Sequence, residues 1–329
     1  MLRLSTPDYR TINQTRSYNA NYGGGEANVA VSLAHFGHNT YFMSKLPPNQ
    51  LGDGAIKHLK GHGVNTDYVV RGSTTLGIYF VETGFGGRPS KVLYNRKHSA
   101  ITRITVEEFD FDEIFKGATW FHLSGITLAL GHRVRTVALK ACEYAKKYGV
   151  KVSFDFNYRA TLWDVEEAIP EYKKIMPYVD VVFASFYDAN TILGIPLDEN
   201  LKDESMPVRR ENVFAKMIDK YNLSYVFGTD RVVYSATENS LAGYYYAKGY
   251  KGKTDPIRFN ILDRIGGGDA FASGVIHGLL KDYNNPDYAV NFGVNTSVLK
   301  HTILGDACVL SVEDIESFMD HIGGAEVKR

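Results

Sequence analysis

The chain has 329 residues, with 37 Lys and Arg against 37 Asp and Glu, so its formal net charge is zero. This balance gives no electrostatic reason to expect nucleic acid or an anionic membrane as a partner. Two cysteines are too few for a disulfide framework and the start shows no secretory signal pattern, so the cytoplasm is the expected location. The longest uncharged apolar stretch, 118–131, is shorter than the roughly 20 residues that span a membrane.

The first expected elements, in chain order, are a strand end, a helix and a β-hairpin. Residues 1–5 have the pattern of the end of a strand, and helical spacing over 26–36 follows a run of glycines. The hairpin spans 78–94, with two strand-like runs on either side of a glycine-rich tip. Together with a short strand at 64–71, it predicts a small β appendage.

From about residue 118 onward, strands and helices alternate. The strands are expected at 119–123, 150–154, 179–183 and 224–227, and the helices at 134–145, 188–193 and 211–221. This alternation predicts an α/β fold with a mostly parallel sheet and helices on both faces. Ligands bind such folds beyond the carboxyl ends of the strands.

The sharpest local signal is the segment 263–271, in which three glycines precede a helix. A glycine loop there exposes backbone N–H groups at a helix N-terminus, which binds anions. The carboxylate of Asp269 is placed to take a proton from a hydroxyl, while the amides of Gly266, Gly267 and Gly268 stabilise a transferring phosphoryl group. The alternative is an ordinary loop in which Asp269 caps the helix.

These features resemble the motifs of the ribokinase-like (PfkB) carbohydrate kinases. Residues 266–271 resemble that family's Gly-Ala-Gly-Asp signature, and 22–30 resemble its sugar-binding motif. A finer resemblance, to 2-keto-3-deoxygluconate kinases, is carried by 77–79, 94–96, 122–126 and 155–163. The resemblance implies one ribokinase-like α/β kinase domain over 1–329, with a discontinuous β-sheet lid from about 8–22 and 64–97.

The implied activity is ATP-dependent phosphorylation of 2-keto-3-deoxygluconate at its 6-hydroxyl, with Mg²⁺ and with Asp269 as the base. A sugar acid carries a carboxylate, which Arg96 and Arg159 would bind because a guanidinium pairs two oxygens at once. Two other readings stay open: a surface ion pair for Arg159, and a solvated basic pair of Arg96 with Lys97.

Other substrate contacts are implied by the resemblance alone. Gly24 would contact the sugar through its backbone, and Tyr79 and Tyr94 would hold its hydroxyls and chain. The remaining implied substrate positions are Gly25, Asn28, Ile126 and Asp306. Packing within the hairpin is the alternative role of the tyrosines, a helix-turn position that of Asn28, and a Gly–Asp turn that of Asp306.

The nucleotide side departs from the family pattern. Relatives carry Asn-x-x-Glu where this chain has 185–188, but Asp188 can still reach Mg²⁺ through water, because that ion keeps several waters. Relatives also carry Lys-x-Gly-x-x-Gly where this chain has 227–231, so Arg231 or Arg264 would supply the missing charge. The implied ATP-binding positions are Asn157, Ser185, Asp188, Gly228, Thr229 and Arg231.

Three alternative functions stay open. They are a kinase of a neutral sugar such as fructose, a sugar-acid-binding relative without catalysis, and a dinucleotide-dependent oxidoreductase, although 23–25 lack that class's glycine spacing. The epimer, gluconate- or galactonate-derived, is also open. Because lid sheets of this family pair between subunits and so cover their edges, a homodimer or larger assembly is expected. Family members begin with a central strand of about ten residues, including its turn, ahead of the segment matching 1–5. Either the start is assigned late or another strand compensates, and both explanations stay open.

Overall fold

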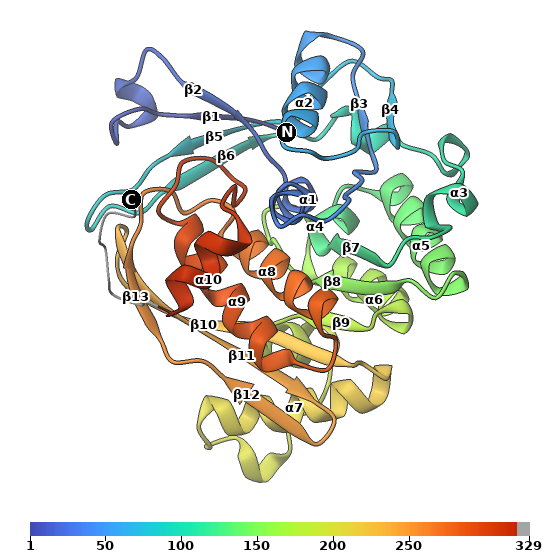
Figure 1. Cartoon of the computed structure of the whole chain (residues 1–329), viewed down its shortest axis with the longest axis vertical. Coiled ribbons are helices and arrows are strands. Elements are labelled where there is room, and N and C mark those ends of the chain that lie inside the picture. Colours follow the sequence, from blue (N-terminus) through green and yellow to red (C-terminus); the bar gives the residue numbers. More distant parts are fainter. Residues whose placement is uncertain (321–329) are drawn as a thin grey trace.

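The main sheet joins four parallel strands to an antiparallel extension (Figure 1). The structure is a computed structural model that describes residues 1–320. In spatial order, the strands are β12 (Tyr250–Lys253), β11 (Glu238–Ala247), β10 (Tyr225–Ser235), β9 (Val181–Phe183), β8 (Lys151–Asp155) and β7 (Trp120–Ser124), while β13 (Ile257–Asn260) also pairs with β11. Strands β7 to β10 run parallel, and β11 is antiparallel to its neighbours. The expected α/β fold is confirmed, with the parallel order in one half of the sheet.

Helices cover both faces of this sheet (Figure 1). One hydrophobic core lies under α3 (Phe111–Phe115), α5 (His132–Lys147), α6 (Val165–Ile175) and α7 (Met206–Tyr221), and a second under α1 (Gly25–His35), α8 (Gly267–Lys281), α9 (Pro286–Lys300) and α10 (Val312–Asp320). In β9, Val182 faces the first core and Val181 and Phe183 the second, because successive side chains of a strand point to opposite faces. The remaining helices are α2 (Gln50–Gly61) and α4 (Gly125–Leu128).

A separate four-stranded sheet, called the lid sheet below, stands beside the main sheet (Figure 1). Its strands, in spatial order, are β2 (Asn19–Tyr22), β1 (Leu2–Ser5), β5 (Ile78–Glu82) and β6 (Lys91–Asn95). The expected hairpin is present as β5 and β6, and its tip is held against the main sheet, because Ala236 N–H donates to the Gly86 carbonyl (2.7 Å).

The lid sheet differs from the expected appendage at two strands. The strand expected at 64–71 is the shorter β4 (Val69–Arg71), which pairs with β3 (Ser44–Leu46) in a third sheet. Its place is taken by β1, which lies between β2 and β5. Strand β1 therefore carries its side chains into the lid, which spacing along the chain did not indicate.

One helix and one strand of this part of the chain are longer than expected. Helix α7 starts at Met206, and Pro207 occupies its first turn, where proline is well tolerated. Strand β10 continues to Ser235 because it pairs along most of its length with β11. Within residues 1–320, no helix combines the length and hydropathy needed to cross a membrane.

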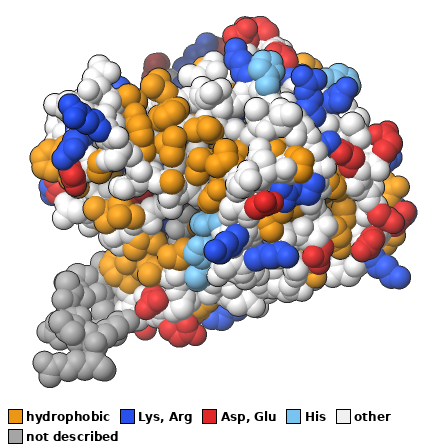
Figure 2. All heavy atoms as spheres, turned by 90° about the horizontal axis from the view of Figure 1, so that it is seen from above, with side chains coloured by type: hydrophobic (Ala, Val, Ile, Leu, Met, Phe, Trp, Pro, Cys, Tyr) orange, Lys and Arg blue, Asp and Glu red, His pale blue; other side chains and the backbone are white. Residues whose placement is uncertain are grey.

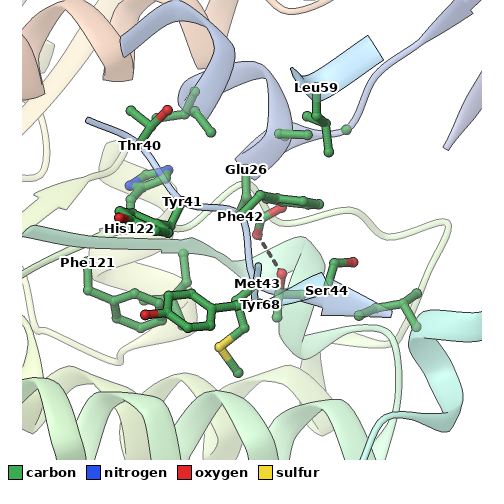
Figure 3. Close-up of a pocket in the computed structure, with 18 of the residues that line it drawn as sticks. Glu26, Thr40, Tyr41, Phe42, Met43, Ser44, Leu59, Tyr68, Phe121 and His122 are labelled. Atoms are coloured by element: carbon green, nitrogen blue, oxygen red, sulfur yellow. Dashed lines mark hydrogen bonds between the residues drawn. The ribbon is translucent and has the colours of Figure 1, made fainter. Parts of the chain in front are cut away.

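A cavity of about 720 Å³ lies between β7 and the extended segment 40–46 (Figure 3). Phe121 and His122 line one side and Thr40 the other, and Met1 also contacts it. In the described part of the chain, β7 pairs only with β8, and the hydroxyl of Thr40 has no partner. The strand expected ahead of residues 1–5 stays a prediction.

Candidate active site

The glycine loop forms the N-terminus of α8, as expected. Gly266 precedes the helix with a φ of +82°, a conformation that only glycine adopts readily. A Cβ on Gly266 would also overlap the carbonyl oxygen of Asp306, and a Cβ on Gly267 would overlap the His301 ring. The loop is therefore packed against 301–306, while Gly268 borders open space and stays accessible to a ligand.

Asp269 lies in the first turn of α8 and faces α1. Its Oδ2 accepts a hydrogen bond from the Asn28 amide (2.6 Å), and Asn28 in turn accepts one from Gly24 N–H (3.2 Å). Burial raises the pKa of Asp269 to about 7, opposed by the Asn28 bond, while the nearby charge of Glu26 adds to the rise. A carboxyl group that titrates near neutrality is matched to general base catalysis.

This shifted pKa predicts a pH dependence. Because only the ionised carboxylate can accept a proton, kcat/KM is expected to fall as pH drops below about 7 and to level off above it. In Asn28→Ala, the loss of the bond to the carboxylate raises the pKa of Asp269 further, so the acid limb is expected to move to higher pH. A profile of kcat/KM from pH 5.5 to 9 tests both statements. If kcat/KM of Asn28→Ala falls at the same pH as that of the unmodified chain, the role of Asn28 is contradicted.

A second carboxyl group, Asp155, was not among the predicted site residues. It ends β8, and its pKa is raised to about 8 by burial and by the negative charge of Asp269. It accepts a hydrogen bond from Asn157 N–H (3.0 Å), and Asn157 has a positive φ of +37°. A polar residue at the carboxyl end of a buried parallel strand was the signal that could have identified Asp155.

Arg96 carries a buried charge that forms no ion pair within residues 1–320, although the charge of Glu26 acts on it from a distance. Its side chain is 6% exposed and its guanidinium lies 4.0 Å over the Tyr94 ring, while neighbouring Lys97 is exposed. Within residues 1–320, its Nε and Nη2 have no hydrogen-bond partner, and burial lowers its pKa. The solvated basic pair is therefore wrong for Arg96, which is placed to receive an anion.

Arg159 is exposed, and its charge acts on Arg96, Asp155 and Asp269. It forms no ion pair with any carboxylate of residues 1–320, so the alternative expected for it is not observed. Two guanidinium groups thus lie close enough to influence each other near Asp269. This arrangement fits an anionic ligand better than a neutral one.

The lid side of the site is formed by Tyr79 and Tyr94, whose rings stack 5.9 Å apart. Tyr79 is buried and donates from its hydroxyl to Asp306, which also accepts from Arg3 (2.9 Å). The polar atoms of Asp306 are therefore already engaged within the protein. Tyr94 is 44% exposed and lies beside Arg96, where a ligand can reach it.

The remaining substrate positions border the cavity. Gly24, Gly25 and Ile126 line it, and a Cβ on Gly25 would lie 3.6 Å from Asp269 Oδ1. Glu26, not predicted as a site residue, also lines the cavity (Figure 3). It accepts a hydrogen bond from the Ser124 hydroxyl (2.7 Å). Of the predicted substrate residues, Gly25 and Asn28 of α1 thus lie directly beside the carboxylate of Asp269.

The predicted ATP positions fall into two groups. Asp188 Oδ2 accepts hydrogen bonds from the backbone N–H and the hydroxyl of Ser185 (both 2.7 Å), and burial raises the pKa of Asp188. Gly228, Thr229 and Arg231 lie inside β10 rather than in a loop. Arg231 approaches the glycine loop through the ring of His301 (3.2 Å), and burial together with Arg264 lowers the pKa of Arg231 to about 10.

Comparison with known proteins identifies the family of this chain. The family model described as pfkB family carbohydrate kinase matches residues 1–307. A solved structure of 2-dehydro-3-deoxygluconokinase from Thermotoga maritima is 43% identical, with a TM-score of 0.91 over 97% of this chain and 95% of that one. The 2-dehydro-3-deoxygalactonokinase of Haloferax volcanii is 29% identical over 96% of this chain and 93% of its own. The 5-dehydro-2-deoxygluconokinase of Clostridium tetani is 27% identical over 94% and 87%.

The ribokinase-like fold, with a glycine loop at a helix N-terminus beside a half-buried carboxyl group, is that of a carbohydrate kinase. The chain belongs to the pfkB family of carbohydrate kinases.

Proposed function

We propose that this protein phosphorylates 2-keto-3-deoxygluconate at its 6-hydroxyl, with ATP as the phosphoryl donor. The observation that carries the proposal is the buried guanidinium of Arg96, which has no anionic partner within residues 1–320. Keeping a charge buried is costly unless it is paired, so the carboxylate of a sugar acid is the expected partner. The positive charge of Arg159 acts on Arg96 and would add to the attraction for that carboxylate.

In the proposed reaction, Asp269 takes the proton of the substrate's 6-hydroxyl while the oxygen of that hydroxyl attacks the γ-phosphorus of ATP. The bond from that phosphorus to the β–γ bridging oxygen breaks, and ADP leaves with the released electron pair. Amides of Gly267 and Gly268 at the start of α8 stabilise the charge on the moving phosphoryl group.

A magnesium ion, when bound, neutralises charge on the ATP phosphates. Ser185 holds Asp188 through Oδ2 only, so Oδ1 is the oxygen available to a metal-bound water. A nearby cation would favour the ionised carboxylate, whose pKa burial otherwise raises. Asp188 is therefore the residue that would hold the ion through water.

An assay coupled to ADP release tests the substrate. Turnover is expected with 2-keto-3-deoxygluconate and, at most, weak turnover with fructose or ribose, which lack the carboxylate. The galactonate-derived epimer belongs in the same series, because one similar protein is a 2-dehydro-3-deoxygalactonokinase. A preference for a neutral sugar would overturn the proposal. A higher kcat/KM for the galactonate-derived acid would keep a sugar-acid kinase but change the epimer that is its substrate.

We also propose that the lid sheet mediates a homodimer. Phe85 and Leu93, both on the hairpin, are more than half exposed, and hydrophobic side chains gather on the face seen in Figure 2. Exposed strand edges and apolar side chains favour pairing with a second copy. Light scattering is expected to give twice the chain mass. A Leu93→Asp variant is expected to shift toward the monomer.

A further inference from the structure

Four side chains form a row across one face of the lid sheet. Arg3 lies in register between Asn21 on β2 and Tyr79 on β5, and Tyr79 lies opposite Tyr94 on β6. Directly paired residues of adjacent strands project from the same face. Arg3 and Tyr79 are each 3% exposed, so this face of the lid is buried against the kinase core at its centre.

Arg3 joins this row to the glycine loop. Its Nη1 lies 2.8 Å from Asp263 Oδ2 and 2.9 Å from Asp306 Oδ1, and the three side chains are at most 5% exposed. The lid strand β1 thus supplies the cation that separates two buried carboxylates. Without it, two like charges would lie close together away from water, which is strongly unfavourable.

Both carboxylate residues hold the glycine loop. Asp263 begins it and accepts a hydrogen bond from Ile265 N–H (3.1 Å), while Lys300 donates to the Asp263 carbonyl (3.1 Å). The carbonyl of Asp306 packs so closely on Gly266 that no Cβ fits between them. A movement of Arg3 would therefore be transmitted to Gly266 through Asp263, which begins the loop, and through Asp306, which packs on it.

The same row leads to the proposed substrate carboxylate. The hydroxyl of Tyr79 donates to Asp306, the ring of Tyr79 stacks on Tyr94, and the Tyr94 ring lies under the guanidinium of Arg96. Contacts therefore run without interruption from Arg96, across the lid, to Arg3 and Asp263.

We propose that Arg3 is a positioning residue that couples sugar-acid binding under the lid to the geometry of the phosphoryl-binding loop. Each ligand then tightens the binding of the other, as thermodynamic linkage requires of coupled sites. This inference rests on the proposed kinase function. It assigns Arg3 no contact with substrate.

Titration calorimetry measures the coupling directly. The dissociation constant of a non-hydrolysable ATP analogue with Mg²⁺ is determined with and without saturating 2-keto-3-deoxygluconate. We expect the sugar acid to tighten analogue binding about fivefold or more in the unmodified chain. The ratio of the two dissociation constants, without and with the sugar acid, measures the coupling. In the double variant Arg3→Met with Asp263→Asn, this ratio is expected to fall close to one. This variant removes one positive and one negative charge, so the cluster keeps its net charge.

Two further variants separate coupling from folding. Arg3→Lys keeps a cation between the carboxylates and is expected to retain an intermediate ratio, even if the double variant fails to fold. Arg88→Met is the matched control, because Arg88 pairs with Glu82 (3.0 Å) within the lid sheet. It is expected to keep the full ratio.

The proposal is overturned if the unmodified chain shows no tightening. It is also overturned if the folded double variant or Arg3→Lys keeps the full ratio, or if Arg88→Met loses it equally. Turnover of the unmodified chain is measured in parallel. Coupling without turnover would contradict the proposed function alone, turnover without coupling would contradict the role of Arg3 alone, and binding of neither ligand would contradict both.

Discussion

Asp269→Asn is expected to lower kcat by about 10²–10⁴-fold, because general base catalysis contributes that much to rate. The amide keeps the size of the side chain and can still meet Asn28, but it cannot accept the proton of the hydroxyl. KM for both substrates is expected to change little. Steady-state kinetics at pH 8, where the unmodified carboxyl group is ionised, gives the clearest comparison.

The stability of Asp269→Asn serves as its control. The pKa of Asp269 is raised on folding, to about 7, so this carboxyl group favours the folded state fully at acid pH and loses that contribution as pH rises from about 4 through 7. At pH 8 the neutral amide avoids a buried negative charge, and the thermal midpoint of the variant is expected to equal or exceed that of the unmodified chain. Near-normal kcat in a folded variant would contradict the assignment of the base.

Arg96→Met is expected to lower kcat/KM for the sugar acid by roughly 10²-fold, since hydrogen bonds to charged groups contribute about 1.5–3 kcal/mol each. Its thermal midpoint is expected to stay unchanged or to rise, because a buried charge without an anionic partner is replaced by an apolar chain of similar length. An activity loss without a stability loss is the signature of a binding residue.

Lys97→Met is the matched control for Arg96→Met. Lys97 is the next residue and is exposed, so its loss is expected to leave both kcat/KM and the thermal midpoint close to those of the unmodified chain. Equal effects of the two variants would indicate a general loss of positive charge rather than a specific site at Arg96.

Local patterns were sufficient to predict the parallel half of the fold and the glycine loop. Apolar periodicity identified β7, α5 and β8, and consecutive glycines before a helix identified the start of α8, because these signals depend on neighbours in the chain. The extension of β10 depended instead on pairing with β11, a contact that the periodicity of either segment does not reveal.

The burial of Arg96 and the contacts of Arg3 depend on distant residues and were not predicted. Arg96 is buried because Tyr94 and the side chain of Met1, 95 residues away, pack on it, whereas its sequence neighbour Lys97 suggested solvent. Arg3 meets Asp306 across 303 residues. No spacing along the chain indicates such pairs, although Asp155 could have been found from its place at a strand end.

The most direct test of the account compares 2-keto-3-deoxygluconate with its neutral carboxamide in the unmodified chain and in Arg96→Met. The unmodified chain is expected to favour the acid by roughly 10²-fold in kcat/KM, and the variant is expected to lose most of that preference. An equal preference for the acid in both proteins would show that the carboxylate binds elsewhere, and this result would contradict the central claim.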